Sequence, residues 1–158
     1  MIKQCSFFFI LITFLQMGCR KECLDLAGSN YLVFGHFYSE CEGEYCVEIF
    51  KLENGKLFED TTDVYPSRTT SYIGEYVQLS EQKYFDTKDL FNDFPQELLD
   101  EKSIVIGKPD ISDLGGIYIE YNCNGKSQFW LIDQVDQNVP TKYHVFIDKI
   151  NEKIWHLQ

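Results

Sequence analysis

Residues 117–133 read IYIEYNCNGKSQFWLID, and this stretch decides the fold class. From Ile117 to Cys123 the apolar side chains recur at every second position, which is the period of a half-buried β-strand. Asn124 and Gly125 both tolerate positive φ angles and give the strongest short-range signal for a tight hairpin. The apolar segment 128–133 then returns beside the first. The stretch predicts an antiparallel β-hairpin.

Strand patterns continue outward from this hairpin toward the N-terminus. A second Asn-Gly pair, Asn54-Gly55, lies between two apolar segments and predicts another hairpin. The polar segment 61–72 contains Pro66 and is expected to be a loop. The remaining predicted strands are rich in β-branched and aromatic residues and cover 30–38, 45–52, 56–59, 74–79 and 104–106.

Two regions carry the helical period instead. Ser80 is a good N-cap for a helix that extends toward Phe94, with a break near Asp86-Thr87, and a short helical turn follows Pro95. After Pro140, apolar residues recur at helical spacing from Tyr143 to Leu157. The predicted fold class is therefore α+β, with an antiparallel sheet of hairpins, one mid-chain helical region and a C-terminal amphipathic helix packed on the sheet.

The N-terminus has the features of an export signal. Lys3 precedes an apolar run over 7–15, which is shorter than the about 20 residues that a membrane span needs. Gly18-Cys19 ends the run and resembles the lipobox of bacterial lipoproteins, although Gln16 stands where Leu is usual. The resemblance implies that Cys19 becomes a lipidated first residue. The alternatives are an ordinary cleaved secretory signal and an uncleaved anchor.

These segments define the expected organisation and location of the chain. Residues 1–18 are a signal peptide of the lipoprotein type, 19–29 a tether, and 30–158 one domain. The 140 residues of the mature chain are enough for a single domain with its own core. A lipid-anchored product would lie in the cell envelope, at the outer membrane or the cell surface. Without lipid it would be periplasmic or secreted.

The charge excludes one class of partner. The chain has a net charge of −11, and loss of Lys3 with the signal makes the mature chain more acidic still. Nucleic-acid binding needs clustered Lys and Arg, and the sequence has no such cluster. The acidity serves solubility or, in the alternative interpretation, attracts a basic protein or cationic ligand. The expected partners are the membrane, through the lipid anchor, and an envelope protein.

The cysteines suggest disulfides. Cys5 leaves with the signal and Cys19 carries lipid, so Cys23, Cys41, Cys46 and Cys123 remain as an even set in an oxidising compartment. Four cysteines allow three pairings, which the sequence alone does not distinguish. Cys41 and Cys46 flank a turn-like insert that would let them meet, and Cys23 with Cys123 would then pin the tether to the sheet. A metal site formed by His36, Cys41 and Cys46 is the alternative.

The segments ECEGEYCV (40–47) and NGKL (54–57) carry a resemblance to a known family. They are similar to a family of uncharacterised bacterial domains, often on lipoproteins, with a Cys-Gly-Cys turn, a strand, a Gly turn and a second strand. Here the spacing from Cys41 to Cys46 is longer, and Val47 stands where Pro is more usual. The resemblance covers roughly residues 30–158. It implies a small α+β domain and no assigned chemistry.

Two further groups are candidates for a binding site. Asp110 and Asp113 precede Gly115-Gly116 in a loop that has either calcium ligands or turn-forming aspartates. On the second hairpin, Phe129 and Trp130 cannot both face the core from one regular strand. One of them, together with Tyr118, would form an exposed binding surface unless a helix or loop covers that face.

No motif for a nucleophile, a metal protease or a phosphate loop is present. We therefore expect no catalytic residues, no resident metal and no cofactor. The expected function is that of a non-catalytic binding or structural module. The alternative is an envelope hydrolase, possibly metal-assisted, that uses Asp110, Asp113 and either His36 or His144.

Overall fold

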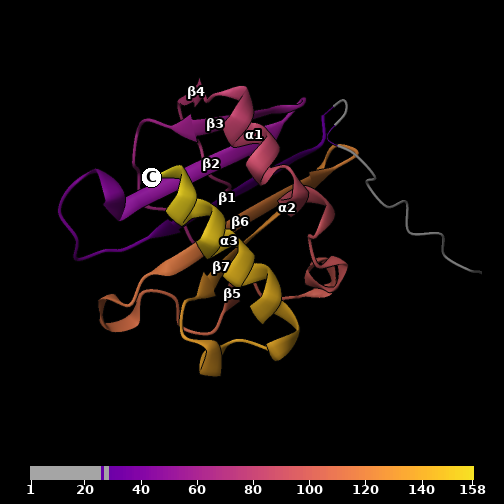
Figure 1. The fold of residues 1–158 in the computed structure, drawn as a ribbon. Coiled ribbons are helices and arrows are strands. Elements are labelled where there is room, and N and C mark those ends of the chain that lie inside the picture. The colour runs from indigo at the N-terminus through magenta and orange to yellow at the C-terminus, as the bar shows by residue number, and fades with distance from the viewer. Residues whose placement is uncertain (1–25, 27–28) are drawn as a thin grey trace, which may run out of the picture.

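The computed structural model describes Leu26 and residues 29–158. These residues build a seven-stranded sheet with helices on one face (Figure 1). The strand order is β4-β3-β2-β1-β6-β7-β5, and every neighbouring pair is antiparallel except β5 with β7. The strands are β1 (Tyr31–Phe37), β2 (Val47–Glu53), β3 (Lys56–Asp60), β4 (Tyr76–Gln78), β5 (Val105–Ile106), β6 (Gly116–Cys123) and β7 (Lys126–Asp133).

Both predicted hairpins are confirmed. Asn54 and Gly55 join β2 to β3 with φ angles of 51° and 72°, and Asn124 and Gly125 join β6 to β7 with 53° and 79°. Two successive positive φ angles define the hairpin turn whose twist matches that of the strands. The register brings Cys123 opposite Lys126 and Ile119 opposite Trp130.

The helices are α1 (Glu81–Thr87), α2 (Asp89–Asn92) and α3 (His144–Leu157), and short 3-10 turns connect other elements. The side chain of Ser80 caps α1 by accepting a hydrogen bond from the Lys83 N–H, as the sequence predicted. The chain interrupts its helical path at Lys88, close to the expected break, and continues as α2. A 3-10 turn over Gln96–Asp100 follows Pro95. The α+β fold class is confirmed.

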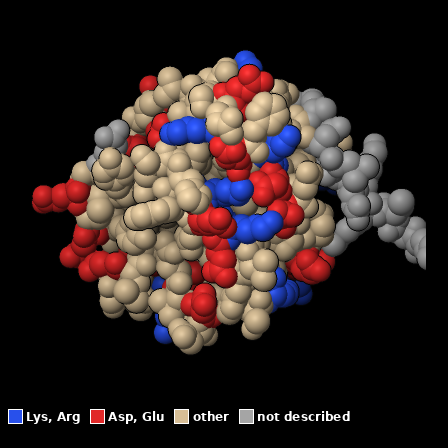
Figure 2. Space-filling view, viewed as in Figure 1, with Lys and Arg blue, Asp and Glu red and all other residues tan. Residues whose placement is uncertain are grey.

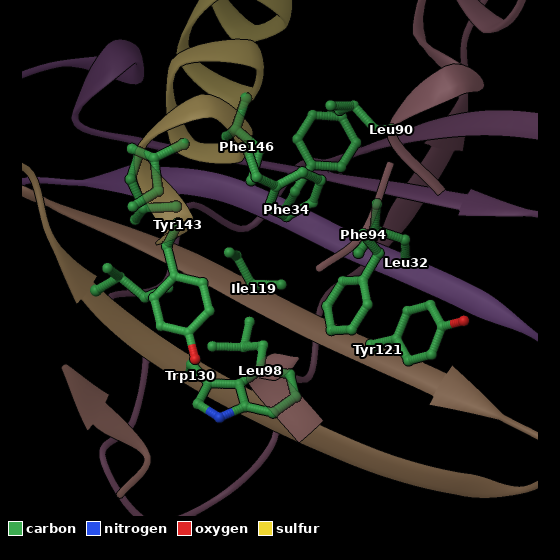
Figure 3. Close-up of a cluster of buried hydrophobic side chains, with 14 of the residues drawn as sticks. Leu32, Phe34, Leu90, Phe94, Leu98, Ile119, Tyr121, Trp130, Tyr143 and Phe146 are labelled. Carbon is green, nitrogen blue, oxygen red and sulfur yellow. The ribbon is translucent and has the colours of Figure 1, made fainter. Parts of the chain in front are cut away.

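The main core lies between the sheet and the helices (Figure 3). Trp130 from β7 is 1% exposed and lies among aromatic rings from other elements. The rings of Phe94 and Tyr121 stack with 4.0 Å between their centroids, and Phe146 of α3 meets Phe94 edge-on. The helices therefore cover this face of the sheet through large apolar side chains.

A row of ion pairs joins α3, and the 3-10 turn Thr141–Tyr143 that precedes it, to the mid-chain helical region. Lys153 lies 3.1 Å from Asp89, Lys149 lies 2.5 Å from Asp93, and Lys142 lies 2.9 Å from Glu101. As the residue numbers of the lysines fall from 153 to 142, those of their acidic partners rise from 89 to 101, so the two segments run antiparallel. Figure 2 shows this row as alternating blue and red side chains near the centre of the helical face.

Lysine side chains also cap the C-terminal ends of α1 and α3, each from the other helix. Lys83 of α1 donates a hydrogen bond to the carbonyl of Leu157, in the last turn of α3. Lys153 of α3 donates to the carbonyl of Asp86, in the last turn of α1. Each lysine places a positive charge at the negative end of the other helix, where it is favourable.

The opposite face of the sheet has no helix and is covered by segment 61–75. A smaller cluster of apolar side chains lies there, including Val33, Ile49 and Leu131. The buried carboxylate of Asp60 holds the covering segment in place. It accepts hydrogen bonds from the Tyr72 hydroxyl (2.6 Å), the Glu75 N–H (2.7 Å) and the Thr62 N–H (3.2 Å).

One detail of the predicted strands is wrong. Tyr45 was expected to share a strand face with Val47 and Ile49, but it lies in a 3-10 turn over Glu44–Cys46 and is 63% exposed. The Cys41–Cys46 disulfide closes a tight loop here, which leaves β2 to begin only at Val47. Separately, within the described part of the chain, no helix is long and apolar enough to cross a bilayer.

Candidate binding site beside helix α3

The aromatic residues predicted as a binding surface are buried. Trp130 belongs to the main core, and Tyr118 is 0% exposed on the opposite face under segment 61–75. Phe129 is half-buried on that same face and stacks on Tyr118. The two neighbours Phe129 and Trp130 do face opposite sides of the sheet, as strand geometry requires. The alternative that a loop covers Tyr118 is the one the structure shows.

The aspartate loop is organised by its own hydrogen bonds. Asp110 accepts from the Tyr65 hydroxyl at 2.7 Å and from the Gly115 N–H at 3.2 Å. Asp110, Ser112 and Asp113 have φ angles of 62°, 56° and 58°. Asp113 is exposed, and the described residues contain no group of three or more metal-binding side chains. The arrangement matches the turn-forming alternative.

The expected pairing of Cys41 with Cys46 is present. Their sulfurs are 2.01 Å apart, so neither cysteine is available as a metal ligand beside His36. Cys123 is also disulfide-bonded. Its expected partner, Cys23, and the lipidation site, Cys19, lie outside the described residues.

A polar corner remains on the helical face of the sheet, beside α3, where β1 ends. We define the α3 corner as His36 and Tyr38 at the end of β1, Gln134 after β7, and Asn151 and Trp155 on α3. Asn151 donates to the Gln134 side-chain carbonyl at 3.3 Å, and the Gln134 amide donates to the Tyr38 hydroxyl at 3.2 Å. The His36 ring meets the Tyr38 ring edge-on at 5.2 Å. Three distant parts of the chain thus converge.

Strand alternation explains why these groups share one face. Leu32 and Phe34 of β1 enter the main core, so His36 continues their side of the sheet beyond the part that the helices cover. Glu48 lies directly across from His36 on β2. Figure 2 shows the surface on this side of α3, to the left of the row of ion pairs, as mostly uncharged.

Burial keeps the two ionisable groups of the corner neutral. It lowers the pKa of His36, whose Nε2 donates to the Tyr45 carbonyl at 3.2 Å. Burial also raises the pKa of Tyr38, and the negative charge of Asp110 adds to that effect. At neutral pH the corner therefore has an uncharged imidazole and a protonated phenol.

The corner includes one exposed aromatic side chain. Trp155 is 76% exposed and lies one helical turn after Asn151, so the two side chains are neighbours on the surface of α3. The residues that anchor this helix, such as Ile150 and Ile154, point to the other side. An indole left in solvent beside fixed amide and phenol groups is typical of a recognition surface.

The structure brings together only some of the predicted site residues. His36 and Asp110 both lie next to Tyr38, at one end of the sheet. His144 lies at the start of α3, where its Nε2 contacts the carbonyls of Asp136 and Val139. Tyr38, Gln134, Asn151 and Trp155 were not predicted. Only Trp155 gave a signal in the sequence, as an aromatic residue outside the apolar stripe of the closing helix.

A second polar network lies under segment 61–75. The buried carboxylate of Glu120 accepts from the hydroxyls of Tyr31 (2.8 Å) and Tyr118 (2.7 Å). Burial, and then the bond to Glu120, raises the pKa of Tyr31 to about 12. The ammonium of Lys51 lies 4.6 Å from the Tyr31 ring centre and 3.0 Å from Glu53. These groups satisfy one another and hold the face together.

No family model and no curated protein matches this chain.

Proposed function

We propose that this chain is an exported, lipid-anchored protein of the cell envelope whose domain is a non-catalytic binding module. Cys19 would carry the lipid, and the domain of residues 30–158 would bind a partner. The observation that carries the proposal is the Cys41–Cys46 disulfide. Disulfides form and persist in oxidising compartments, which agrees with the export signal and the lipobox-like Gly18-Cys19.

The position of the corner supports a role in recognition. The tether 19–29 leads into β1 at Tyr31, and His36 and Tyr38 lie at the other end of this strand. A strand of seven residues is about 20 Å long. A domain held to a membrane by its N-terminus would therefore direct the α3 corner away from the lipid surface, toward other components of the envelope.

The geometry favours binding over hydrolysis. Asp110 uses both carboxylate oxygens on Tyr65 and Gly115, and His144 contacts backbone carbonyls at the other end of α3. In the corner, amide, phenol and imidazole groups hold one another in fixed positions. Preorganised polar groups beside an exposed aromatic ring suit the binding of a ligand.

The anchor is tested by fatty-acid labelling of cells that express the full-length chain. We expect label on the wild-type protein and on Cys5→Ala, because Cys5 lies within the signal peptide. Cys19→Ala should lose the label and leave the membrane fraction. An unlabelled wild-type protein, or labelled Cys19→Ala, would overturn the proposal.

A further inference from the structure

We propose that the α3 corner binds an uncharged saccharide, with the indole of Trp155 as the surface on which a sugar ring stacks. This inference rests on the proposed binding function and names the class of its ligand. The main observation behind it is an exposed Trp next to a series of hydrogen-bonded polar groups, which come from β1, from the residue after β7 and from α3.

Trp155 supplies the apolar part of such a site. A sugar ring presents a face of C–H groups that packs against a flat aromatic side chain. Trp155 is 76% exposed although it is the largest side chain on α3, and Trp130, the only other Trp, is fully in the core. Its neighbour Asn151, one turn earlier, begins the polar chain toward Tyr38.

The polar groups supply both kinds of hydrogen bond. His36 Nε2 donates to a carbonyl, so in the neutral ring Nδ1 is an acceptor. The Tyr38 hydroxyl accepts from Gln134 and retains its own hydrogen to donate. Asn151 donates through Nδ2 and retains its carbonyl oxygen. A sugar hydroxyl both donates and accepts, so it complements this mixture of donors and acceptors.

The charges of the corner favour a ligand without charge. His36 and Tyr38 are neutral for the reasons given above. An anion would meet Glu48 across from His36 and Asp110 near Tyr38, with no lysine of the row on this side of α3. The exposed carboxylates of Asp148 and Glu152, one turn before Asn151 and Trp155 on α3, would repel an anion further. A cation would gain only these solvent-screened charges, because Asp110 is already bonded to Tyr65 and Gly115 and Glu48 is buried. A neutral ligand avoids the repulsion that an anion would meet and needs no charged partner in the corner.

The native fluorescence of the protein gives the first test, with detergent-purified protein from the full-length chain. Trp155 is the only exposed Trp among the described residues, so its emission should change when a sugar stacks on it. The probes are chitotetraose and cellotetraose, at concentrations up to about 10 mM. A saturating change with chitotetraose alone would indicate an amino-sugar polymer, and one with cellotetraose alone a glucan. No change with either probe would overturn the inference.

Variants then locate the site by calorimetric titration with the sugar that binds. Trp155→Ala should weaken binding about tenfold or more, and Asn151→Ala should weaken it less. Val145→Ala is the matched control, because Val145 is a 73% exposed apolar residue of the same helix outside the corner. In Trp155→Phe the remaining emission, from Trp130, should not respond to sugar. Unchanged affinity in Trp155→Ala would overturn the inference.

The two proposals fail independently. Loss of sugar binding leaves the lipid label on Cys19 unaffected, whereas an unlabelled protein that still binds sugar would disprove only the anchor.

Discussion

The two faces of the sheet are covered in different ways. On the helical face, large apolar side chains from six or more elements fill the core, and the row of ion pairs lies at its solvent edge. On the opposite face, a segment without helix or strand is held by hydrogen bonds to the buried carboxylate of Asp60 and to the hydroxyl of Tyr118, which in turn donates to the buried carboxylate of Glu120. Burial of large apolar side chains stabilises the first face, and hydrogen bonds to a few buried oxygen atoms hold the covering segment on the second.

This difference teaches where each kind of substitution should act. Shortening a side chain on the helical face removes burial from the whole domain, so it should lower global stability. Changing one carboxylate oxygen on the other face should first release segment 61–75. The α3 corner lies at the edge of the helical face, where Trp155 is exposed, and substitution of Trp155 should leave the fold intact.

The largest expected effect is that of Trp130→Ala. Removing a fully buried Trp typically costs about 3–5 kcal/mol in the free energy of unfolding. Trp155→Ala makes the same chemical change at an exposed site, so it should cost only about 0.5 kcal/mol or less. Denaturant unfolding followed by circular dichroism measures both. Equal losses in the two variants would contradict the assignment of Trp130 to the core and Trp155 to the surface.

Asp60→Asn should weaken the loop-covered face. Asn keeps one acceptor oxygen but its amide nitrogen cannot accept, so the side chain loses either the bonds of Oδ2 from Tyr72 and Thr62 or the bond of Oδ1 from Glu75. The expected cost is about 1–3 kcal/mol. Segment 61–75 contains one trypsin site, Arg68, which is exposed. Limited digestion should therefore cut after Arg68 faster in this variant.

The control is Asp93→Asn, at an exposed ion pair with Lys149 on the helical face. It should leave the rate of cleavage after Arg68 unchanged. If both variants are cut at the wild-type rate, Asp60 does not hold the segment.

Alkaline pH should act on the loop-covered face as well. The pKa of Tyr31 is raised from 10.0 to about 12 in the folded protein, so its stabilising contribution is complete below pH 10. That contribution is lost as the pH rises from 10 through about 12, because the unfolded chain binds fewer protons there. Denaturation midpoints at about pH 9 and about pH 11 should differ less in Tyr31→Phe than in the wild type. An identical pH dependence in both proteins would count against the bond from Tyr31 to Glu120.

The smallest effect is expected from Lys149→Ala. The ion pair with Asp93 is partly exposed, and solvent screening leaves such a pair with little effect on stability. Thermal unfolding should show a small loss that added salt reduces. A loss as large as that of Asp60→Asn would mean that the row of ion pairs does more than border the core.

Local patterns explain how much of this fold was predictable. The alternation over 117–123, the two Asn-Gly turns and the helical spacing after Tyr143 each depend on neighbouring residues, and the strand, the turns and the helix that they predict were confirmed. The expectation that strand 117–123 is half-buried was wrong, because segment 61–75 and the helices cover both of its faces. The exposed Tyr45 lies in the local loop that the Cys41–Cys46 disulfide closes, whereas the buried Tyr118 depends on a distant partner, segment 61–75. The parallel pairing of β5 with β7 was not predicted for the same reason.

The α3 corner was out of reach of the sequence for a related reason. Tyr38 and Gln134 are 96 residues apart in the sequence, and Gln134 and Asn151 are 17 apart. The residues around each of them give no sign that these side chains meet. Only the register of β1 against β6 and β7, together with the placement of α3, brings them together. The expected aromatic surface was therefore placed on the second hairpin, whereas the exposed Trp is on the closing helix.

The most direct test of the central claim is the intact mass of the protein extracted from membranes, with a peptide map made without reduction. A lipid-anchored envelope protein predicts a chain that starts at Cys19, carries acyl groups and has Cys41 joined to Cys46. An N-terminus without lipid, together with unpaired thiols on Cys41 and Cys46, would contradict both the anchor and the compartment.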